Sequence, residues 1–158
     1  EGIQGAVVSA GIATGVVILV IMASAAIGWL LTYAQIPQTF AEWALATLQS
    51  PWLIILAMNG IMLAAGMFID LPAAILLLGP IFVPLAKTIG LDIEQLGIIM
   101  VLNLGIGLFT PPVGTTLFIS SSIAKVSIIE ASLELWPYYL ASLAVLMLFS
   151  YVPALTLG

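Results

Sequence analysis

Long runs of uncharged, mostly apolar residues make up nearly all of this chain, and charged residues occur only between them. The uncharged runs cover residues 2–41, 43–69, 71–86, 95–124 and 135–158. About 18 apolar residues suffice to cross the hydrocarbon of a bilayer as a helix, and four of the five runs exceed that length. Stretches such as AAILLL at 73–78 are apolar on every face, which favours helices over half-exposed strands. The pattern predicts an all-α, polytopic membrane protein.

The segment 51–87 must fold back on itself. A continuous helix over these residues would be about 55 Å long, roughly twice the hydrocarbon thickness of about 30 Å. Asp70-Leu71-Pro72 interrupts the segment near its middle. Two forms are open: two full spans with Asp70 in a water-exposed turn, or a re-entrant hairpin with Asp70 at its tip inside the membrane. In both forms Pro51 and Lys87 lie on one side, with Lys125 on the other and the C-terminus back beside Lys87.

The segment 96–124 is predicted to be a helix broken at its middle. Thr110-Pro111-Pro112-Val113-Gly114 lies there. Two adjacent prolines remove two backbone donors and clash with the preceding turn, and glycine adopts dihedrals that other residues avoid. Irregular backbone at membrane depth occurs where protein or a water-filled cavity surrounds it, and freed carbonyls can bind a cation such as sodium. We therefore expect a binding waist at 110–114, although a proline kink that only shapes the helix is an alternative.

The remaining segments complete the predicted topology. Residues 6–34 predict one tilted spanning helix that ends before Pro37. Residues 37–50 predict a short interfacial helix, with a connecting loop as the alternative. An amphipathic segment at 127–135 precedes a last crossing at 136–153. We divide the chain into a scaffold helix with an interfacial helix (1–50), a hairpin with a broken helix (51–126), and a last transmembrane unit (127–158).

Composition narrows the possible functions. Hydrophobic residues make up 63% and charged residues 6% of the 158, and the chain contains no cysteine and no histidine. Without histidine, neither a rhomboid-type serine protease nor a histidine-bound zinc site can form, and an intramembrane aspartyl protease needs two membrane carboxylates where this chain offers one. We predict that the protein is not an enzyme, uses no cofactor and binds no nucleic acid. Because the chain begins at Glu1 without a starting methionine, we also expect it to be part of a longer protein.

Several motifs resemble the second half of the large permease subunit of TRAP (tripartite ATP-independent periplasmic) transporters. The resemblance covers essentially the whole chain, and the Asn-to-Gly stretch with its double proline is its most specific part. The residues that carry it are GMFID at 66–70, Pro80 and Pro84, GIIM at 97–100, NLGIGLFTPPVG at 103–114, and YVPAL at 151–155.

The resemblance implies an all-α fold: the second inverted repeat of an elevator-type ion transporter, with a re-entrant hairpin and a broken helix. It further implies a sodium-driven permease in a bacterial or archaeal cytoplasmic membrane. The permease would work with a small membrane subunit and a periplasmic substrate-binding protein, and its substrate would be a small organic acid such as a carboxylate. Sodium would be the coupling ion.

The predicted site residues follow from the waist and from this resemblance. The sodium candidates are Gly66, Asp70, Thr110, Pro111, Val113 and Gly114. The substrate candidates are Asn103, which lies two helical turns before Thr110 and can share its face, and Thr115 and Thr116. These two threonines stand where the family pattern has an apolar residue and an asparagine. Helix packing explains Gly66 equally well.

Two other functions are open at this point. One is a sodium/carboxylate carrier of the same superfamily that works without a binding protein. The other is a helical membrane assembly module whose broken helix only packs. Sodium-dependent uptake would distinguish either carrier from the module.

Overall fold

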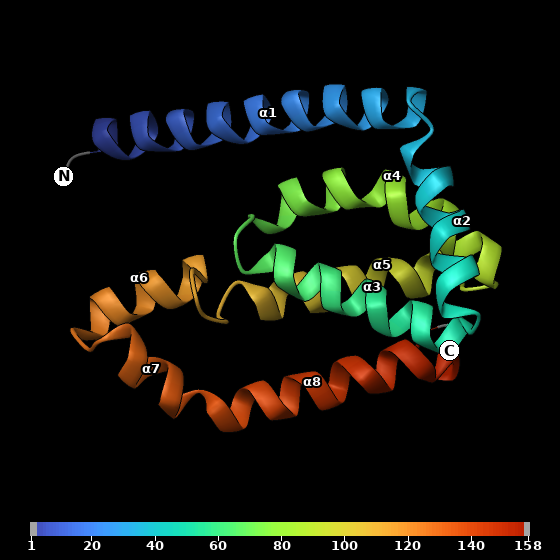
Figure 1. The fold of residues 1–158 in the computed structure, drawn as a ribbon. Coiled ribbons are helices and arrows are strands. Elements are labelled where there is room, and N and C mark those ends of the chain that lie inside the picture. Colours follow the sequence, from blue (N-terminus) through green and yellow to red (C-terminus); the bar gives the residue numbers. More distant parts are fainter. Residues whose placement is uncertain (1–2, 157–158) are drawn as a thin grey trace.

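The chain folds entirely into helices and the turns between them. The computed structural model describes the backbone of residues 3–156, with all of their side chains except those of residues 13, 17, 20 and 24. The described part contains no strand, which confirms the prediction of an all-α protein. The helices, shown in Figure 1, are α1 (Ile3–Tyr33), α2 (Ile36–Leu48), α3 (Pro51–Gly66), α4 (Leu71–Ile89), α5 (Ile93–Gly107), α6 (Thr115–Ala124), α7 (Ile128–Glu134), α8 (Trp136–Tyr151) and a final 3₁₀ turn, Pro153–Leu155.

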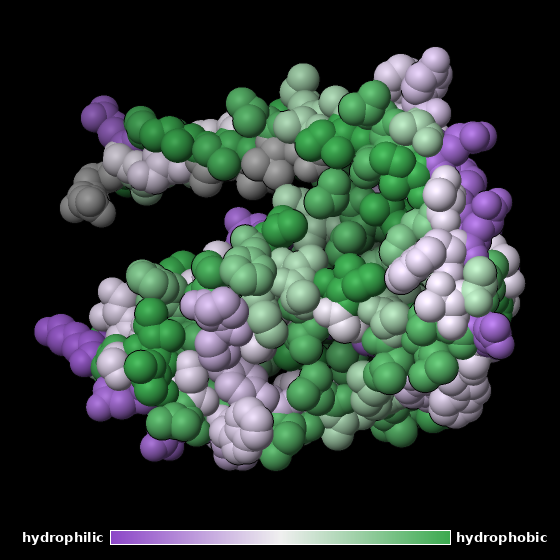
Figure 2. Space-filling view, viewed as in Figure 1, coloured by the Kyte–Doolittle hydropathy of each residue, from purple (hydrophilic) through white to green (hydrophobic). Residues whose placement is uncertain are grey.

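Several of these helices are suited to a membrane. By length and composition, α1 and α4 can each cross one alone, and α3, α5 and α8 are shorter apolar helices. Figure 2 shows hydrophobic residues over the middle of the visible face, with hydrophilic residues gathered toward its two ends. Such a distribution is typical of a protein whose middle lies in an apolar layer and whose ends meet water.

The predicted hairpin is formed by α3 and α4, which are joined by a turn at 67–70 (Figure 1). Pro51 occupies the first turn of α3, and Gly90 ends α4 in the left-handed conformation at φ 75°. The chain then turns into α5, where the Asp92 side chain accepts a hydrogen bond from the Glu94 N–H at 2.7 Å. As a result, α3 and α5 run in the same direction and pack side by side.

The hydrophobic core lies among α3, α4 and α5. Its fully buried side chains include Met62 of α3, Phe82 and Leu85 of α4, and Leu96 and Leu104 of α5. Leu146 brings α8 against the same cluster. The hairpin and the helix before the break are therefore packed as one unit.

The two N-terminal helices are placed largely as predicted. α1 lies along α4, and most of its described side chains are exposed. α2 is a helix, so the alternative of a connecting loop at 37–50 is wrong. Its buried residues are Pro37, Ala41 and Ala44, whereas Trp43 is exposed. Small residues thus let α2 cross closely over α4, and its large aromatic side chain points away from the protein.

The start of α3 and the end of α8 meet at one end of the molecule. The rings of Trp52 and Tyr151 stack with centroids 4.6 Å apart, and the Tyr151 hydroxyl donates to the Trp52 carbonyl at 3.0 Å. The end of α4, which carries Lys87, lies at this end too, whereas Lys125 follows α6 at the opposite end (Figure 1). The arrangement agrees with the prediction that Pro51, Lys87 and the C-terminus lie on one side and Lys125 on the other.

The segment after the broken helix bends sharply. α6 and α7 meet at 104°. Ser127 and Glu130 form a capping box at the start of α7: the Ser127 hydroxyl accepts from the Glu130 N–H at 3.2 Å, and the Glu130 carboxylate accepts from the Ser127 N–H at 3.0 Å. The predicted amphipathic segment is thus a short helix that leads into α8.

Candidate functional site

The predicted break in the second long helix is present. α5 ends at Gly107 and α6 begins at Thr115, with residues 108–114 non-helical between them. Pro111 and Pro112 have no N–H and so cannot continue the helical hydrogen bonds. Gly114, just before α6, has φ 42°, in the left-handed region that glycine tolerates. We call residues 110–114 the waist.

The carbonyl groups just before the waist are all satisfied. The Gly107 carbonyl accepts from the Thr110 N–H at 3.0 Å, and the Leu108 carbonyl accepts from the Thr116 N–H at 3.0 Å. The Phe109 carbonyl accepts from the hydroxyl of Tyr139 in α8 at 2.6 Å. The carbonyls of residues 107–109 therefore accept hydrogen bonds from three different parts of the chain.

The first four carbonyl groups of the waist are free. Within residues 3–156, no N–H or hydroxyl donates to the carbonyls of Thr110, Pro111, Pro112 or Val113, and the same is true of Gly66 at the end of α3. Thr110 and Pro111 are half-buried, whereas Pro112 and Val113 are exposed. Because unpaired carbonyls are costly at membrane depth, such a group of oxygens needs water or a cation as a partner.

The tip of the hairpin lies directly against this break. The Gly114 N–H donates to the Met67 carbonyl at 3.1 Å. A Cβ added to Gly107 would lie 2.6 Å from the Gly66 Cα, and one added to Gly66 would lie 3.2 Å from the Gly107 Cα. Only two glycines allow the backbones of α3 and α5 to approach so closely. The hairpin tip is thus packed against the end of α5, just before the waist.

Asp70 and Thr115 meet beside the same place. The Thr115 Oγ1 donates to the Asp70 Oδ1 at 3.4 Å, a long hydrogen bond between exposed groups. The tip lies level with the break, and α6 continues for 10 residues beyond it. A pair of full spans would instead carry Asp70 to the far end of α6. The contacts therefore favour the re-entrant form of the hairpin.

Four helix ends converge at this point. α3 and α5 end there, so their C-termini present partial negative charge, and α4 and α6 begin there, so their N-termini present partial positive charge. The first turn of α4 also leaves the N–H groups of Leu71 and Ala73 without an acceptor in the described chain. The site can thus attract a cation to one part and an anion to another.

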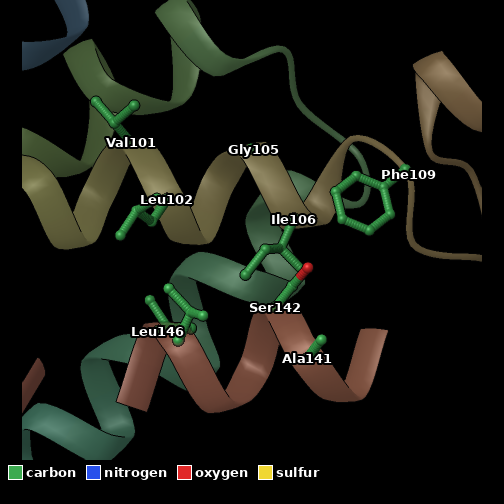
Figure 3. Close-up of a pocket in the computed structure, with 9 residues that line it drawn as sticks. Val101, Leu102, Gly105, Ile106, Phe109, Ala141, Ser142 and Leu146 are labelled. Atoms are coloured by element: carbon green, nitrogen blue, oxygen red, sulfur yellow. The ribbon is translucent and has the colours of Figure 1, made fainter. Parts of the chain in front are cut away.

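A large apolar groove lies elsewhere in the described protein. A groove of about 510 Å³ runs between α5 and α8 (Figure 3), and apart from one serine its lining has no polar side chain. Its lining residues are Val101, Leu102, Gly105, Ile106, Phe109, Ala141, Ser142, Val145 and Leu146. No group of three or more His, Cys, Asp or Glu residues lies together in the described range, so a cation at the break would depend mainly on backbone oxygens.

Comparison with known proteins identifies the family. Residues 1–155 match the DctM component of the tripartite ATP-independent periplasmic transporters. The chain belongs to the DctM family. The family and those of its members with a stated activity are transporters rather than enzymes, which confirms that prediction.

Individual relatives agree with this assignment. An uncharacterized protein of Sinorhizobium fredii is 63% identical over 151 residues, which cover 96% of this chain and 36% of the relative. The C4-dicarboxylate TRAP transporter large permease protein of Pseudomonas aeruginosa is 41% identical over 128 residues, or 81% of this chain and 30% of the relative. The sialic acid TRAP transporter large permease protein of Vibrio cholerae is 33% identical over 144 residues, or 91% and 34%. This DctM chain spans about a third of the length of these relatives.

One predicted substrate residue lies away from the break. Asn103 is fully buried between α5 and α3, where its Nδ2 donates to the Asn59 carbonyl at 2.9 Å and to the Asn59 Oδ1 at 2.7 Å. The Asn59 Nδ2 in turn donates to the Ser150 hydroxyl at 3.0 Å. In α6, Thr115 is half-buried beside Asp70 and Thr116 is exposed. Substrate contact by these three residues remains a prediction for the DctM chain.

Sequence reasoning missed residues that hold the site together. Gly107 appeared only within the motif at 103–114, and its contact with Gly66 could not be predicted because the two residues lie on different helices. Nothing in the sequence distinguished Tyr139, which is one of several aromatic residues near the start of an apolar helix. Met67 contributes only its carbonyl, so no side-chain pattern could have identified it.

Proposed function

We propose that this DctM chain is part of the membrane permease subunit of a sodium-coupled TRAP transporter. In this proposal the complete protein imports a small organic acid across a bacterial or archaeal cytoplasmic membrane. A periplasmic binding protein delivers the acid, and a small membrane subunit completes the transporter. The division into units at 1–50, 51–126 and 127–158 is retained as part of the proposal, with residues 1–2 and 157–158 lying outside the described range.

The observation that carries the proposal is the set of free carbonyls at the waist, which lies beside the hairpin tip. Sodium is a hard cation that prefers oxygen ligands, and carbonyls at the ends of two half-helices are suitable. The Gly66 carbonyl from the tip and the Thr110, Pro111 and Val113 carbonyls from the waist supply such oxygens from two elements. The Gly114 N–H donates to the Met67 carbonyl, and this hydrogen bond holds the tip against the waist. Asp70 adds a carboxylate at the tip.

The N-termini of α4 and α6 are suited to binding an anionic substrate. Their partial positive charge favours a carboxylate, and the free N–H groups at the start of α4 are hydrogen-bond donors for it. The substrates named for two of the relatives, a C4-dicarboxylate and sialic acid, are carboxylates. Thr115 and Thr116, in the first turn of α6, are candidate contacts for the same group.

Reconstituted transport tests the proposal. The complete permease, with its small subunit, is placed in proteoliposomes, and uptake of a labelled carboxylate is measured with an inward sodium or potassium gradient. We expect uptake with sodium and the binding protein, and background uptake when either is omitted. Sodium-driven uptake without the binding protein would instead support the binding-protein-independent carrier. No uptake of any organic acid under a sodium gradient would support the assembly module.

A further inference from the structure

The Phe109 carbonyl is left open by the break in the helix. In an uninterrupted helix it would accept from the N–H of Val113, four residues on. The chain leaves the helix at Leu108, so this bond does not form, and in apolar surroundings an unpaired carbonyl is costly. Another group must therefore bind this oxygen.

Tyr139 of α8 binds it. The Tyr139 hydroxyl donates to the Phe109 carbonyl at 2.6 Å, and the two rings stack with centroids 5.6 Å apart and planes 7° from parallel. Figure 3 shows Phe109 at the end of α5, on the side where α8 passes. Tyr139 is buried at 7% exposure, whereas its neighbour Tyr138 is 65% exposed. The hydroxyl and the ring of Tyr139 thus both contact Phe109, the residue just before the waist.

The peptide group between Phe109 and Thr110 is held at both of its polar atoms. Its carbonyl oxygen accepts from Tyr139, and its N–H donates to the Gly107 carbonyl at 3.0 Å. A peptide group is planar, so two such bonds fix its orientation. The next carbonyl along the chain is that of Thr110, the first free oxygen of the waist.

We propose that Tyr139 is a positioning residue for the cation site. By fixing the Phe109–Thr110 peptide, its hydroxyl sets the direction in which the waist carbonyls point. This inference rests on the proposed function, because it concerns the affinity of the same site for sodium. It adds a residue of α8 that touches neither the cation nor the waist carbonyls directly.

The test is Tyr139→Phe in the complete transporter, with Tyr138→Phe as the matched control. Sodium-dependent uptake gives the half-saturating sodium concentration and the maximal rate, and melting without sodium gives the stability. We expect Tyr139→Phe to raise the half-saturating sodium concentration about threefold to tenfold, the value of one hydrogen bond. The maximal rate at saturating sodium should stay within about twofold, because the site still forms when it is filled. Tyr138→Phe should match the wild type.

Other outcomes are distinguishable. If Tyr139→Phe and Tyr138→Phe have the same sodium affinity while the wild type needs sodium, the positioning role is wrong and the proposed function stands. A loss of stability without sodium, at unchanged sodium affinity, would overturn the positioning role in the same way. A wild type that transports without sodium overturns both proposals.

A second variant tests the proposal in case Tyr139→Phe folds poorly. Replacing Tyr139 by para-aminophenylalanine keeps a weaker donor at the same place. We expect a smaller rise in the half-saturating sodium concentration, in the same direction. A half-saturating sodium concentration raised by about tenfold or more, in a protein that keeps this donor and melts like the wild type, would contradict the role of the hydroxyl.

Discussion

Two polar regions lie inside this otherwise apolar bundle, and they are built in opposite ways. At the network of Asn59, Asn103, Ser150 and Gln95, side chains that are at most 3% exposed join α3, α5 and α8. Each amide donates to a neighbouring oxygen, and within the described residues only the Asn103 Oδ1 is a buried side-chain oxygen without a partner. At the waist, the backbone carbonyls of residues 110–113 belong to partly or fully exposed residues and have no donor in the described chain.

The difference separates a structural polar region from the region that we propose to bind a cation. Buried groups that satisfy one another fix how helices pack, but they offer little to a ligand. Carbonyl oxygens without a donor are still able to bind a cation. In the sequence both regions are polar interruptions of apolar runs, and the donors and acceptors in the structure distinguish them.

The largest effect is expected where the waist meets the hairpin tip. Gly107→Ala places a methyl group against the backbone of Gly66, so α3 and α5 must separate and the Gly114–Met67 hydrogen bond is lost. Forcing an added methyl group into a packed contact costs about 1–3 kcal/mol. Sodium-driven uptake by the complete permease should fall about tenfold or more.

Gly105→Ala is the matched control for this variant. A Cβ at Gly105 meets no atom within 4 Å. Its uptake, normalised to the amount of protein in the membrane, should equal that of the wild type. Equal uptake by Gly107→Ala and Gly105→Ala would show that the close approach of the two helices is not needed for transport.

A smaller effect, and of a different kind, is expected in the buried network. Asn103→Leu removes the donor to Asn59 and leaves the Asn59 Oδ1 without a partner, at a cost of about 1–3 kcal/mol of stability. The melting temperature of the purified permease should fall by several degrees, while its half-saturating sodium and substrate concentrations stay within about twofold. A raised substrate KM at unchanged melting temperature would instead place Asn103 in the substrate site, as its position in the sequence predicted.

The smallest effect is expected at the rim of the tip. The hydrogen bond from Thr115 to Asp70 is long and exposed, so Thr115→Val removes little stabilisation. Sodium affinity should change by less than about twofold, as measured by sodium-dependent uptake. A tenfold loss would show that the Thr115 hydroxyl binds the cation or the substrate directly.

Local features of this fold could be predicted from the sequence because local chemistry determines them. Pro111, Pro112 and Gly114 predicted the break, and the charge-free runs predicted the helices. The length of 51–87 predicted that the chain folds back at Asp70. In each case a proline, a charge or a length limit acts within one segment, so no knowledge of its neighbours is needed.

Contacts between segments could not be predicted in the same way. Most of the helices are apolar on every face, so hydrophobic periodicity does not show which face meets which partner. Asn103 was placed on the face of Thr110 by spacing alone, but Asn59 binds it inside the α3–α5 contact. On α2 the sequence predicted a helix but not that its small residues are buried while Trp43 is exposed.

Direct sodium binding tests the central claim, that the waist carbonyls facing the hairpin tip form a cation site. The complete permease and its Pro111→Ala/Pro112→Ala variant are purified, and their melting temperatures are measured over a range of sodium chloride concentrations, with potassium chloride as the control. A ligand that binds only the folded protein raises its melting temperature. We expect sodium, but not potassium, to stabilise the wild type. The two alanines restore backbone donors and favour a continuous helix, so the variant should need about tenfold more sodium for the same shift. Equal stabilisation of both proteins by sodium, or none of the wild type, would contradict the claim.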